Sequence, residues 1–582
     1  MSLLGYLLAA ALALSATASA ASAAGAEAAS LAVRIIAIND FHGHLEPGDN
    51  TIQIAHPADP ARLIPLRSGG AAHLAARVRA LRADVPHSVF VAAGDLVGAS
   101  PLVSALFRDE PTIEVMNLMG LELNAVGNHE FDHGTEELTR LIDGGCASAP
   151  RGEVDTCANP AGRYAGATFP FIAANVLQAS GEPWLPPAWV RTIDGVKLGF
   201  IGAVTRSTPG IVMPTGIRDL RFLPEAEAIN RQVKALRAQG VHALVAVVHE
   251  GGDAEGGVNA CENPSGPIFD IVRALDPAVS VVVSAHTHRG YNCLIDGRIV
   301  IQGASFGRLV SVVDLQIDRG SGEVLRDRTR ALNLPVPNGS DAALDPLVRR
   351  AHPPLAADPD IDALVAHYRA RAAPLASRPV ARLAATFDRR PSDGGDHAAG
   401  RLIADAHLAA TRAAGAHIAF TNPGGVRGDL SARPPHGDVT FGDVFTLQPF
   451  GNSLVTLTLS GAQLKQLLES QWSRRGDRAR FLQPSRGFSY AWTDDRPWGE
   501  RVDPASLRLD GARIDPQGRY RVTVNSFLAA GGDGFALLRN ADERVGGPLD
   551  VDALASYLRA AGRAGPVAPD PVARIRRIRP GP

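Results

Sequence analysis

The chain has 582 residues, which is too long for one hydrophobic core and corresponds to three or four domain-sized units at most. Apolar residues make up 45% and charged residues 20%, a balance that excludes a disordered or fibrous chain. The 58 Lys and Arg nearly cancel the 60 Asp and Glu, so the net charge of −2 gives no reason to expect a nucleic-acid polymer as partner. Four cysteines are too few for a disulfide scaffold.

The first segment has the pattern of a secretory signal. Leu3–Leu14 form an apolar run, and Ala-Ser-Ala triplets at 18–20 and 21–23 offer cleavage sites. The run is shorter than the roughly 20 apolar residues that a membrane span needs. We therefore expect a signal peptide over residues 1–24, a periplasmic or extracellular protein, and no stable membrane insertion. A mis-assigned start or an apolar N-terminus without targeting role is the alternative, because no Lys or Arg precedes Arg34.

The first half of the chain alternates short β-branched runs with helix-like segments. This alternation predicts a layered α/β sheet with helices on its faces. The expected strands are Val33–Asn39, Ser88–Ala93, Leu123–Val126, His242–Val248, Ser280–Ser284 and Ile299–Gln302, and the expected helices include Gly70–Leu81 and Glu225–Ala238.

The second half is separated from the first by a connector. Residues 334–378 are Pro-rich and then helical over Ile361–Ala372, which is typical of a link between domains. We therefore predict one domain over residues 31–333, a connector or hinge over 334–378 and a second domain over 379–578. The elements expected in the second domain are strands Leu383–Thr386, Leu454–Leu459 and Tyr520–Val524 and helix Ala398–Ala413.

The cysteines agree with an exported protein, which meets an oxidising compartment. Cys146 and Cys157 bracket a short loop, and Cys261 and Cys293 flank a strand-like segment. Four cysteines allow three pairings, of which the nearest-neighbour pairing is the simplest. Free thiols are the alternative.

Five of the strand-like runs in the first half end in potential metal ligands. Ligands bind outside the carboxyl ends of the strands in open α/β sheets, so these side chains could converge on one rim. Glycines before Asp95 and Asn128 would let the backbone turn sharply there. The ligand candidates are Asp40, His42, Asp95, Asn128, His249, His286 and His288.

The ligand types favour two divalent ions, because imidazole and carboxylate groups suit Zn, Mn, Fe or Co. Two such ions, about 3.5–4 Å apart, can clamp the attacking and leaving oxygens of a phosphoryl transfer. Asp95, in the middle of the ligand order, is the best candidate for a bridging carboxylate. Two dications outweigh the charges of Asp40 and Asp95, which leaves a positive site suited to a phosphate dianion.

These segments resemble the five signature blocks of calcineurin-like metallophosphoesterases. The NDFHG motif at 39–43 and the GNHEFD motif at 127–132 are similar to those of the secreted 5′-nucleotidases, including bacterial UDP-sugar hydrolase/5′-nucleotidases. The resemblance implies an N-terminal four-layer α/β/β/α sandwich and a C-terminal α/β substrate-binding domain. It implies two metal sites that share Asp95, one with Asp40, His42 and His288, the other with Asn128, His249 and His286.

The resemblance also assigns an acid–base dyad. His129 with Asp132 is similar to the family's catalytic pair, in which a carboxylate holds the imidazole protonated. The imidazole can stabilise phosphoryl charge or protonate the leaving oxygen. The neighbouring Glu130 and His133 are expected only to support the dyad.

The second half carries blocks that resemble the family's nucleotide site. Two phenylalanines that sandwich the base, an aspartate for the ribose hydroxyls, and a glycine-rich loop with an arginine for phosphate are implied. Core aromatics are the alternative for the phenylalanines. The implied binding residues are Asn422, Gly424, Gly425, Arg427, Phe450, Asn452, Phe527 and Asp533, with Arg389 and Arg390 as two candidates for a further phosphate ligand.

The expected function is release of phosphate from nucleoside 5′-monophosphates by a metal-activated water. UDP-sugars, 2′,3′-cyclic nucleotides and 3′-nucleotides are alternative substrates of the same scaffold. A nucleotide-binding protein without turnover is the alternative of another class, and His129 with Asp132 argues against it, because a binder needs no acid. Purely structural metals are disfavoured, since closed structural sites prefer four Cys or His ligands.

Overall fold

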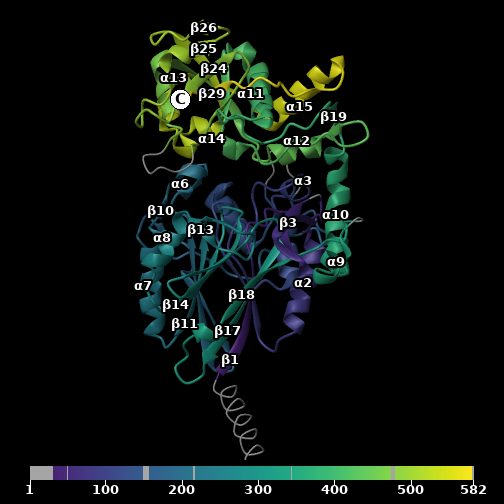
Figure 1. Ribbon diagram of the computed structural model, residues 1–582, viewed down its shortest axis with the longest axis vertical. Helices are drawn as coiled ribbons and strands as arrows, with labels where there is room; N and C mark the ends of the chain where they lie inside the picture. The colour runs from purple at the N-terminus through teal and green to yellow at the C-terminus, as the bar shows by residue number, and fades with distance from the viewer. Residues whose placement is uncertain are drawn as a thin grey trace, which may run out of the picture.

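The computed structural model describes residues 30–579 apart from 49, 148–155, 214–215, 342–343 and 473–478. The predicted signal peptide, residues 1–24, lies outside the described residues. Two α/β domains follow each other along the long axis of the molecule, as Figure 1 shows. This is the two-domain architecture that the sequence predicts.

The N-terminal domain contains two six-stranded sheets whose central strands are parallel. The first has the order β18 (Arg330–Pro335), β17 (Leu309–Asp318), β1 (Ser30–Ile38), β4 (Ser88–Ala92), β5 (Leu123–Ala125), β6 (Phe171–Ile172). The second has the order β15 (Gly290–Ile295), β16 (Arg298–Gly303), β14 (Val279–Ser284), β11 (Ala243–His249), β9 (Val196–Val204), β8 (Ala188–Ile193).

Side-chain alternation along the strands explains why the sheets stack. Ile35 of β1 and Val245 of β11 point into one core between the sheets. Ile36 of β1 points the other way, toward α2 (Ala71–Ala83) and α4 (Glu110–Met119), and Leu244 of β11 points toward α7 (Glu225–Arg237) and α8 (Pro267–Ala274). Strands buried on both faces read as continuous apolar runs, as they do here. The α/β/β/α layering is confirmed.

The C-terminal domain is built on a five-stranded sheet that packs helices on both faces. Its order is β23 (Gln483–Pro484), β20 (Ile418–Thr421), β27 (Arg519–Asn525), β22 (Ser453–Ser460), β28 (Asp542–Leu549). Its helices are α11 (Ala398–Thr411), α12 (Phe441–Leu447), α13 (Gly461–Glu469), α14 (Ser526–Ala529) and α15 (Asp550–Ala561). A small sheet adds β26 (Ala512–Arg513), β25 (Arg508–Leu509), β24 (Phe488–Trp492) and β29 (Ile575–Arg577).

The connector contains the long helix α10 (Pro359–Ala376). The carboxylate of Asp358, the residue before the helix, caps its first turn. Ile361, Val365 and Tyr368 of this helix are buried in the core that α2 and α4 form with the first sheet. The Tyr368 hydroxyl donates a hydrogen bond of 2.8 Å to Glu114 of α4. The helix therefore packs as part of the N-terminal domain.

The strand expected over Leu383–Thr386 is wrong. The strand at this point is β19 (Pro379–Arg382), which pairs with β21 (Asp438–Thr440). Leu383 forms only a single bridge to Val567, and the chain turns away after it. The hairpin of β2 (Thr51–His56) and β3 (Asp59–Arg67) was not predicted, because prolines within a run argue against a strand.

The shorter elements of the N-terminal domain lie at its edges. They are α3 (Leu102–Ala105), α5 (Gly134–Asp143), α6 (Thr208–Ile211), α9 (Pro346–Ala351), β7 (Val176–Gln178), β10 (Leu220–Phe222), β12 (Asp253–Glu255) and β13 (Glu262–Ser265). Within the described ranges, every helix is too short or too polar to cross a bilayer.

Both disulfides follow the nearest-neighbour pairing. Cys146 is bonded to Cys157 and Cys261 to Cys293, so the simplest of the three pairings is confirmed.

Candidate functional site

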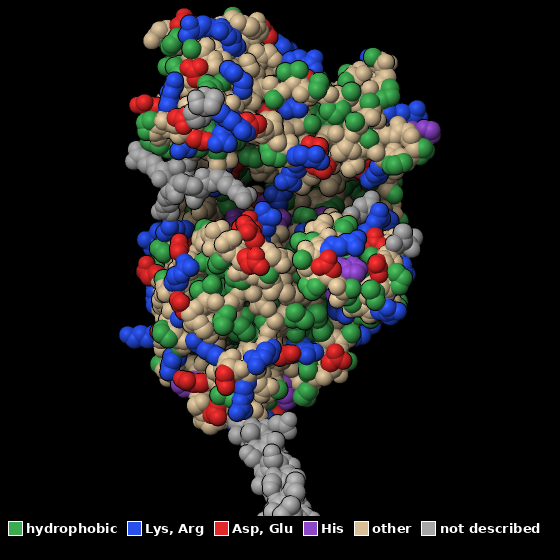
Figure 2. Space-filling model, viewed as in Figure 1, with side chains coloured by type: hydrophobic (Ala, Val, Ile, Leu, Met, Phe, Trp, Pro, Cys, Tyr) green, Lys and Arg blue, Asp and Glu red, His purple; other side chains and the backbone are tan. Residues whose placement is uncertain are grey.

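The candidate ligands lie where the sequence predicts, directly beyond the carboxyl ends of the parallel strands. β1 leads to Asp40 and His42, β4 to Asp95, β5 to Asn128, β11 ends at His249, and β14 leads to His286 and His288. Both sheets present these ends toward the C-terminal domain. Figure 2 shows a cleft between the two domains with histidine and basic side chains inside it.

The backbone at the ligands is left-handed. Asp40, His42, Asp95, His286 and His288 have φ between 49° and 71°, a region that non-glycine residues rarely adopt. Clusters of such residues mark sites whose surroundings impose a required geometry. The sequence did not reveal this conformation.

The two predicted turn glycines have different roles. Gly94 has a φ of 83° and supplies the expected sharp turn before Asp95. Gly127 has no positive φ, so the same expectation is wrong for it. A Cβ at Gly127 would come within 2.2 Å of the Asp95 carboxylate, and glycine is needed there for space.

Two groups of side chains converge, and Asp95 lies between them. In the first, His288 Nε2 is 3.2 Å from His42 Nε2 and 3.3 Å from Asp40 Oδ1. In the second, His249 Nε2 is 3.0 Å from Asp95 Oδ2, and His286 completes the group. Asp95 Oδ2 is also 3.6 Å from His42 Nε2, so one carboxylate reaches both groups.

Backbone carbonyls orient the imidazoles. His42 Nδ1 is 2.7 Å from the carbonyl oxygen of Gly98, and His249 Nδ1 is 2.8 Å from that of Ala93. Each Nδ1 therefore donates its hydrogen, and Nε2 faces the centre, where a cation would take the place of a proton. Such outer partners are the usual way in which proteins fix ligating histidines.

The site fits divalent cations. Asn128 Oδ1 is buried and has no hydrogen-bond partner among the described residues, although a buried acceptor normally has one. Burial lowers the pKa of His249, but the charges of Asp95 and Asp40 outweigh burial and raise this pKa to about 10. Buried carboxylates that draw a proton this strongly would also draw a metal ion, which replaces the proton.

A hydrogen-bonded His–Asp pair, the candidate dyad, lies beside the candidate ligands. His129 Nδ1 is 2.7 Å from Asp132 Oδ2, and the His129 backbone N–H donates a 2.8 Å hydrogen bond to Asp95 Oδ1. Burial lowers the pKa of His129, but Asp132 and Asp95 outweigh it and raise this pKa above its ordinary value. The imidazole is therefore suited to carry a proton.

Glu130 holds the loops that carry the ligands. Its buried carboxylate accepts hydrogen bonds from the backbone N–H groups of Asp95 (2.9 Å), Leu96 (2.9 Å) and Gly127 (2.7 Å). It thus joins the loop after β4 to the loop after β5. Glu130 is expected from the sequence only to support His129 and Asp132, and in the structure it also holds the two ligand loops together.

The C-terminal domain places an aromatic ring directly over the dyad. The Phe450 ring stacks on the His129 ring with centroids 5.8 Å apart and planes 13° apart. The Arg427 guanidinium carbon lies 5.7 Å from the Phe450 ring centre. The two domains therefore meet beside the candidate metal ligands, and the C-terminal domain places the Arg427 guanidinium there.

The glycine-rich loop is tied to Asp533. Asn422 Nδ2 donates a 2.7 Å hydrogen bond to Asp533 Oδ2, and Asn525 Nδ2 donates a 3.1 Å bond to Asn422 Oδ1. At Gly425, a Cβ would come within 2.8 Å of Asn422 Oδ1, whereas Gly424 has more space. Asn422 is therefore held by the side chains of Asp533 and Asn525, and Gly425 packs against it.

A second bond links the two phenylalanine loops. Ser526 Oγ donates a 3.1 Å hydrogen bond to Asn452 Oδ1, and Ser526 directly precedes Phe527. Sequence reasoning missed both Asn525 and Ser526. An Asn directly before a short helix is a favoured N-cap and could have drawn attention to Asn525, whose side chain caps α14.

The two candidate arginines differ in position. Arg389 is close enough to Arg427 for its charge to lower the Arg427 pKa, after the larger effect of burial. The backbone N–H of Arg389 is held by Asp429 at 2.8 Å. The backbone N–H of Arg390 donates a 3.1 Å hydrogen bond to Asp388, and both arginines are exposed. Of the two, Arg389 is the one whose charge acts on the pKa of Arg427.

Comparisons with known proteins agree with this architecture. Residues 33–290 match the calcineurin-like phosphoesterase family, and residues 376–540 match the 5′-nucleotidase C-terminal domain. The cell wall protein Lmo0130 of Listeria monocytogenes is 31% identical over 569 residues, which cover 92% of this chain and 68% of that protein. The chain belongs to the 5′-nucleotidase family of calcineurin-like phosphoesterases.

Other members of this family differ in length. The endonuclease YhcR of Bacillus subtilis is 31% identical over 91% of this chain, but the chain spans only 40% of its length. The crystal structure of a 5′-nucleotidase precursor from Thermus thermophilus superposes with a TM-score of 0.72 at 26% identity, covering 95% of this chain and 100% of that chain. The phosphoesterase fold implies divalent metals, and the groups around Asp40 and Asp95 are where this family member would hold them.

Proposed function

We propose that this chain is an exported phosphohydrolase that releases phosphate from nucleoside 5′-monophosphates with two divalent cations, drawn from Zn, Mn, Co or Fe. The observation that carries the proposal is the stacking of Phe450 on His129 across the domain boundary. It brings a flat aromatic surface, suited to a base, next to an acid–base dyad and a cluster of metal ligands.

The residues of the N-terminal domain would hold the two cations and supply the proton donor. Asp40, His42, Asp95 and His288 would hold one cation, and Asp95, Asn128, His249 and His286 the other. Bound cations supply Lewis acidity that neutralises phosphoryl charge and makes water nucleophilic near neutral pH. His129, kept protonated by Asp132, stabilises the phosphoryl charge or gives its Nε2 proton to the departing 5′-oxygen. The products are inorganic phosphate and a nucleoside.

The C-terminal domain orients the nucleotide. Arg427 and Arg389 pair with phosphate oxygens, and Phe450 and Phe527 stack on the base. Asp533, which Asn422 holds in place, accepts from the ribose hydroxyls. Asn452 and the backbone at Gly424 and Gly425 complete this side of the cleft. Each base–aromatic stack contributes roughly 1–3 kcal/mol to binding.

Export is part of the proposal. The apolar run at Leu3–Leu14 has the form of a secretory signal, and both cysteine pairs are oxidised in the structure. A relative carries the name cell wall protein. Each of these supports a protein that works outside the cytoplasm.

The test is hydrolysis of a panel of substrates by metal-stripped full-length protein that is reloaded with one metal at a time. Inorganic phosphate is measured, and the other products are identified by chromatography. The panel contains AMP, UDP-glucose, 2′,3′-cyclic AMP and 3′-AMP. We expect phosphate release from AMP, its loss on chelation and its recovery with at least one divalent metal. Absence of release from AMP with every metal would contradict the proposal, and faster turnover of another substrate would reassign the substrate class.

A further inference from the structure

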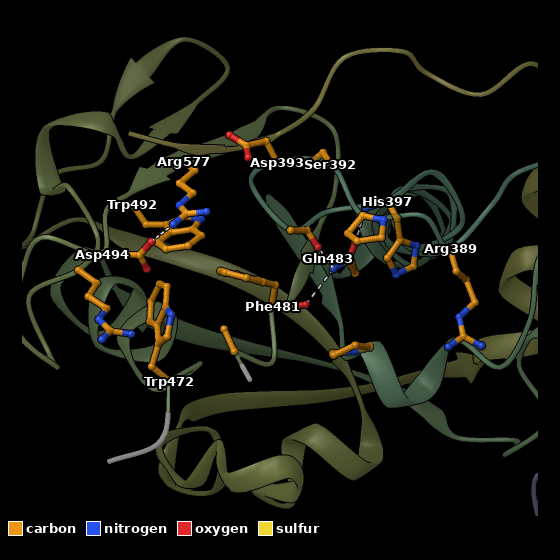
Figure 3. Close-up of a pocket in the computed structure, with 15 residues that line it drawn as sticks. Arg389, Ser392, Asp393, His397, Trp472, Phe481, Gln483, Trp492, Asp494 and Arg577 are labelled. Atoms are coloured by element: carbon orange, nitrogen blue, oxygen red, sulfur yellow. Dashed lines mark hydrogen bonds and ion pairs between the residues drawn. The ribbon is translucent and has the colours of Figure 1, made fainter. Parts of the chain in front are cut away.

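A cavity of about 770 Å³ opens in the C-terminal domain, and its lining includes Arg389 and Pro423 of the proposed nucleotide site. Figure 3 shows the rings of Trp472, Phe481 and Trp492 at one end and His397 and Arg389 at the other. None of the nucleotide-site roles above uses the aromatic end. The aromatic end of the cavity is therefore free of any role assigned so far.

The aromatic end consists of three rings tilted by 36° to 90° against one another, of which Phe481 is the most exposed. Trp472 and Trp492 are buried, and the half-buried Phe481 ring lies 5.5 Å from the first and 5.1 Å from the second. Gly395 packs so closely on Phe481 that a Cβ there would come within 2.2 Å of the ring. The Phe481 ring is thus held in place while part of it remains accessible, which is the arrangement of a stacking platform.

The opposite end offers hydrogen-bond donors. The backbone N–H of Gly400 donates a 3.0 Å hydrogen bond to His397 Nδ1, so the proton of the neutral ring is on Nε2. The Arg389 guanidinium lies at the same end. At the aromatic end Arg577 is already paired with Asp494 beside Trp492. Arg501 also lines the cavity, with its guanidinium carbon 5.7 Å from the Trp472 ring centre, so cationic groups lie at both ends.

Two residues that line the cavity are next in sequence to residues that contact Asp533, the aspartate proposed to bind the ribose. Pro423 lines the cavity and follows Asn422, whose amide binds Asp533 at 2.7 Å. Phe481 lines it and follows Arg480, which donates a 3.4 Å bond to the Asp533 carbonyl and lies 3.9 Å from Asp533 Oδ1. A group attached to the ribose at Asp533 would therefore enter beside a half-exposed guanidinium and reach an aromatic ring.

We propose that this cavity is a subsite for a second nucleotide, linked to the 3′-oxygen of the nucleotide whose 5′-phosphate faces the metal ligands. The second base stacks on Phe481, and Arg480 faces the linking phosphate and offsets the charge of Asp533. The preferred ligand class is then a 5′-phosphorylated dinucleotide, which still loses only its 5′-phosphate. This inference rests on the proposed function, because that function sets the direction of the bound nucleotide.

The test compares three ligands: AMP, 5′-phosphorylated ApA, and the same dinucleotide without its second base. Affinities are measured by calorimetry with metal-stripped full-length protein, which excludes turnover. We expect the dinucleotide to bind at least about fivefold more tightly than AMP and than the abasic analogue. Phe481→Ala should remove the advantage over the abasic analogue. Phe445→Ala, a half-buried phenylalanine of α12 outside the cavity, should keep it.

Equal affinities in the wild-type protein, or an advantage that survives Phe481→Ala, would overturn the subsite. If Phe481→Ala does not fold, as judged by circular dichroism, Arg480→Gln replaces it. Arg480→Gln should weaken the binding of the dinucleotide and of its abasic analogue relative to the binding of AMP. An unchanged ratio of these affinities would overturn the proposal as well. Phosphate release from AMP by the metal-loaded enzyme is measured in parallel. Release without a dinucleotide advantage removes the subsite alone, whereas no release removes the proposed function.

Discussion

Ser526 donates a hydrogen bond of 3.1 Å to the side-chain oxygen of Asn452, and this bond joins the loop of Phe527 to the loop of Phe450. The two phenylalanines come from distant parts of the sequence, after β27 and after α12. If these phenylalanines stack on the base as proposed, this bond would hold their two loops at a fixed separation. A residue that need not touch the base would then set the spacing of the proposed slot.

Ser526→Ala should raise KM for AMP with little change in kcat. One neutral hydrogen bond contributes about 0.5–1.5 kcal/mol, which corresponds to a roughly two- to tenfold effect. Hydrolysis of p-nitrophenyl phosphate, which has no base, should not change. Thr446→Ala removes a hydroxyl from the exposed side of α12 and is the control. Equal losses on both substrates would show that the serine does not act through the base slot.

Asp95→Asn should abolish most turnover, because one neutral amide cannot serve both ligand groups. We expect kcat to fall by more than about 100-fold, beyond the usual effect of losing an outer partner of a metal ligand. Metal content after dialysis, measured by mass spectrometry, should fall with it. Asp270→Asn, an exposed change on α8, should keep both values. Wild-type rates in the Asp95 variant would exclude a bridging role.

Glu130→Gln should weaken metal binding without touching a metal ligand. The carboxylate accepts hydrogen bonds from three backbone N–H groups. In glutamine one of the two oxygens is replaced by an NH₂ group, which is itself a donor and cannot accept these bonds. We expect metal affinity to fall by about 10–100-fold and unfolding free energy by about 1–3 kcal/mol. Competition with a chelating dye and urea unfolding measure the two effects. Glu137→Gln on α5 is the matched control.

His407 should make the folded protein sensitive to acid. Burial lowers its pKa from 6.5 to about 3, so between these values the unfolded chain binds a proton that the folded chain does not. Stability contributed by the neutral ring is present above pH 6.5 and is lost as the pH falls. Between pH 6.5 and 5 this loss is about 2 kcal/mol.

Urea unfolding at pH 7.5 and pH 5 measures this effect. His407→Gln, which cannot titrate, should lose less stability between the two pH values than the wild-type protein. The exposed His417→Gln in the same domain should lose as much as the wild type. An identical pH dependence in His407→Gln and wild type would mean that other groups cause the acid sensitivity.

Periodicity and strand–helix alternation predict the ligand-bearing strands β1, β4, β5, β11 and β14 and the helices α2, α7 and α11 to within a few residues. The positions of Asp40 and Asp95 are predictable because they follow neighbouring parallel strands that end at one edge of a sheet. His249 ends β11 of the other sheet, so its proximity depends on how the two sheets stack. The hairpin of β2 and β3 is not predictable in this way. It carries prolines, and it exists because Ile52 and Leu66 pack against Leu309 of the first sheet.

Other features depend on contacts that no short motif contains. Gly127 reads as a turn residue, but its small size is required by the Asp95 carboxylate, which comes from another strand. Arg389 and Arg390 are adjacent and chemically equal, and only the fold decides which of them approaches Arg427. Ser526 and Asn452 are 74 residues apart, so their bond follows from the pairing of β22 with β27.

The packing of α10 changes where this protein should be divided. Only Ser377 and Arg378 separate the helix from β19, so we propose that the joint between the halves lies there and not across residues 334–378. A fragment cut near 333 would lose the end of β18. It would also expose the apolar surface on which Ile361, Val365 and Tyr368 pack. Limited proteolysis should accordingly release an N-terminal piece that ends close to Ala376 and stays soluble.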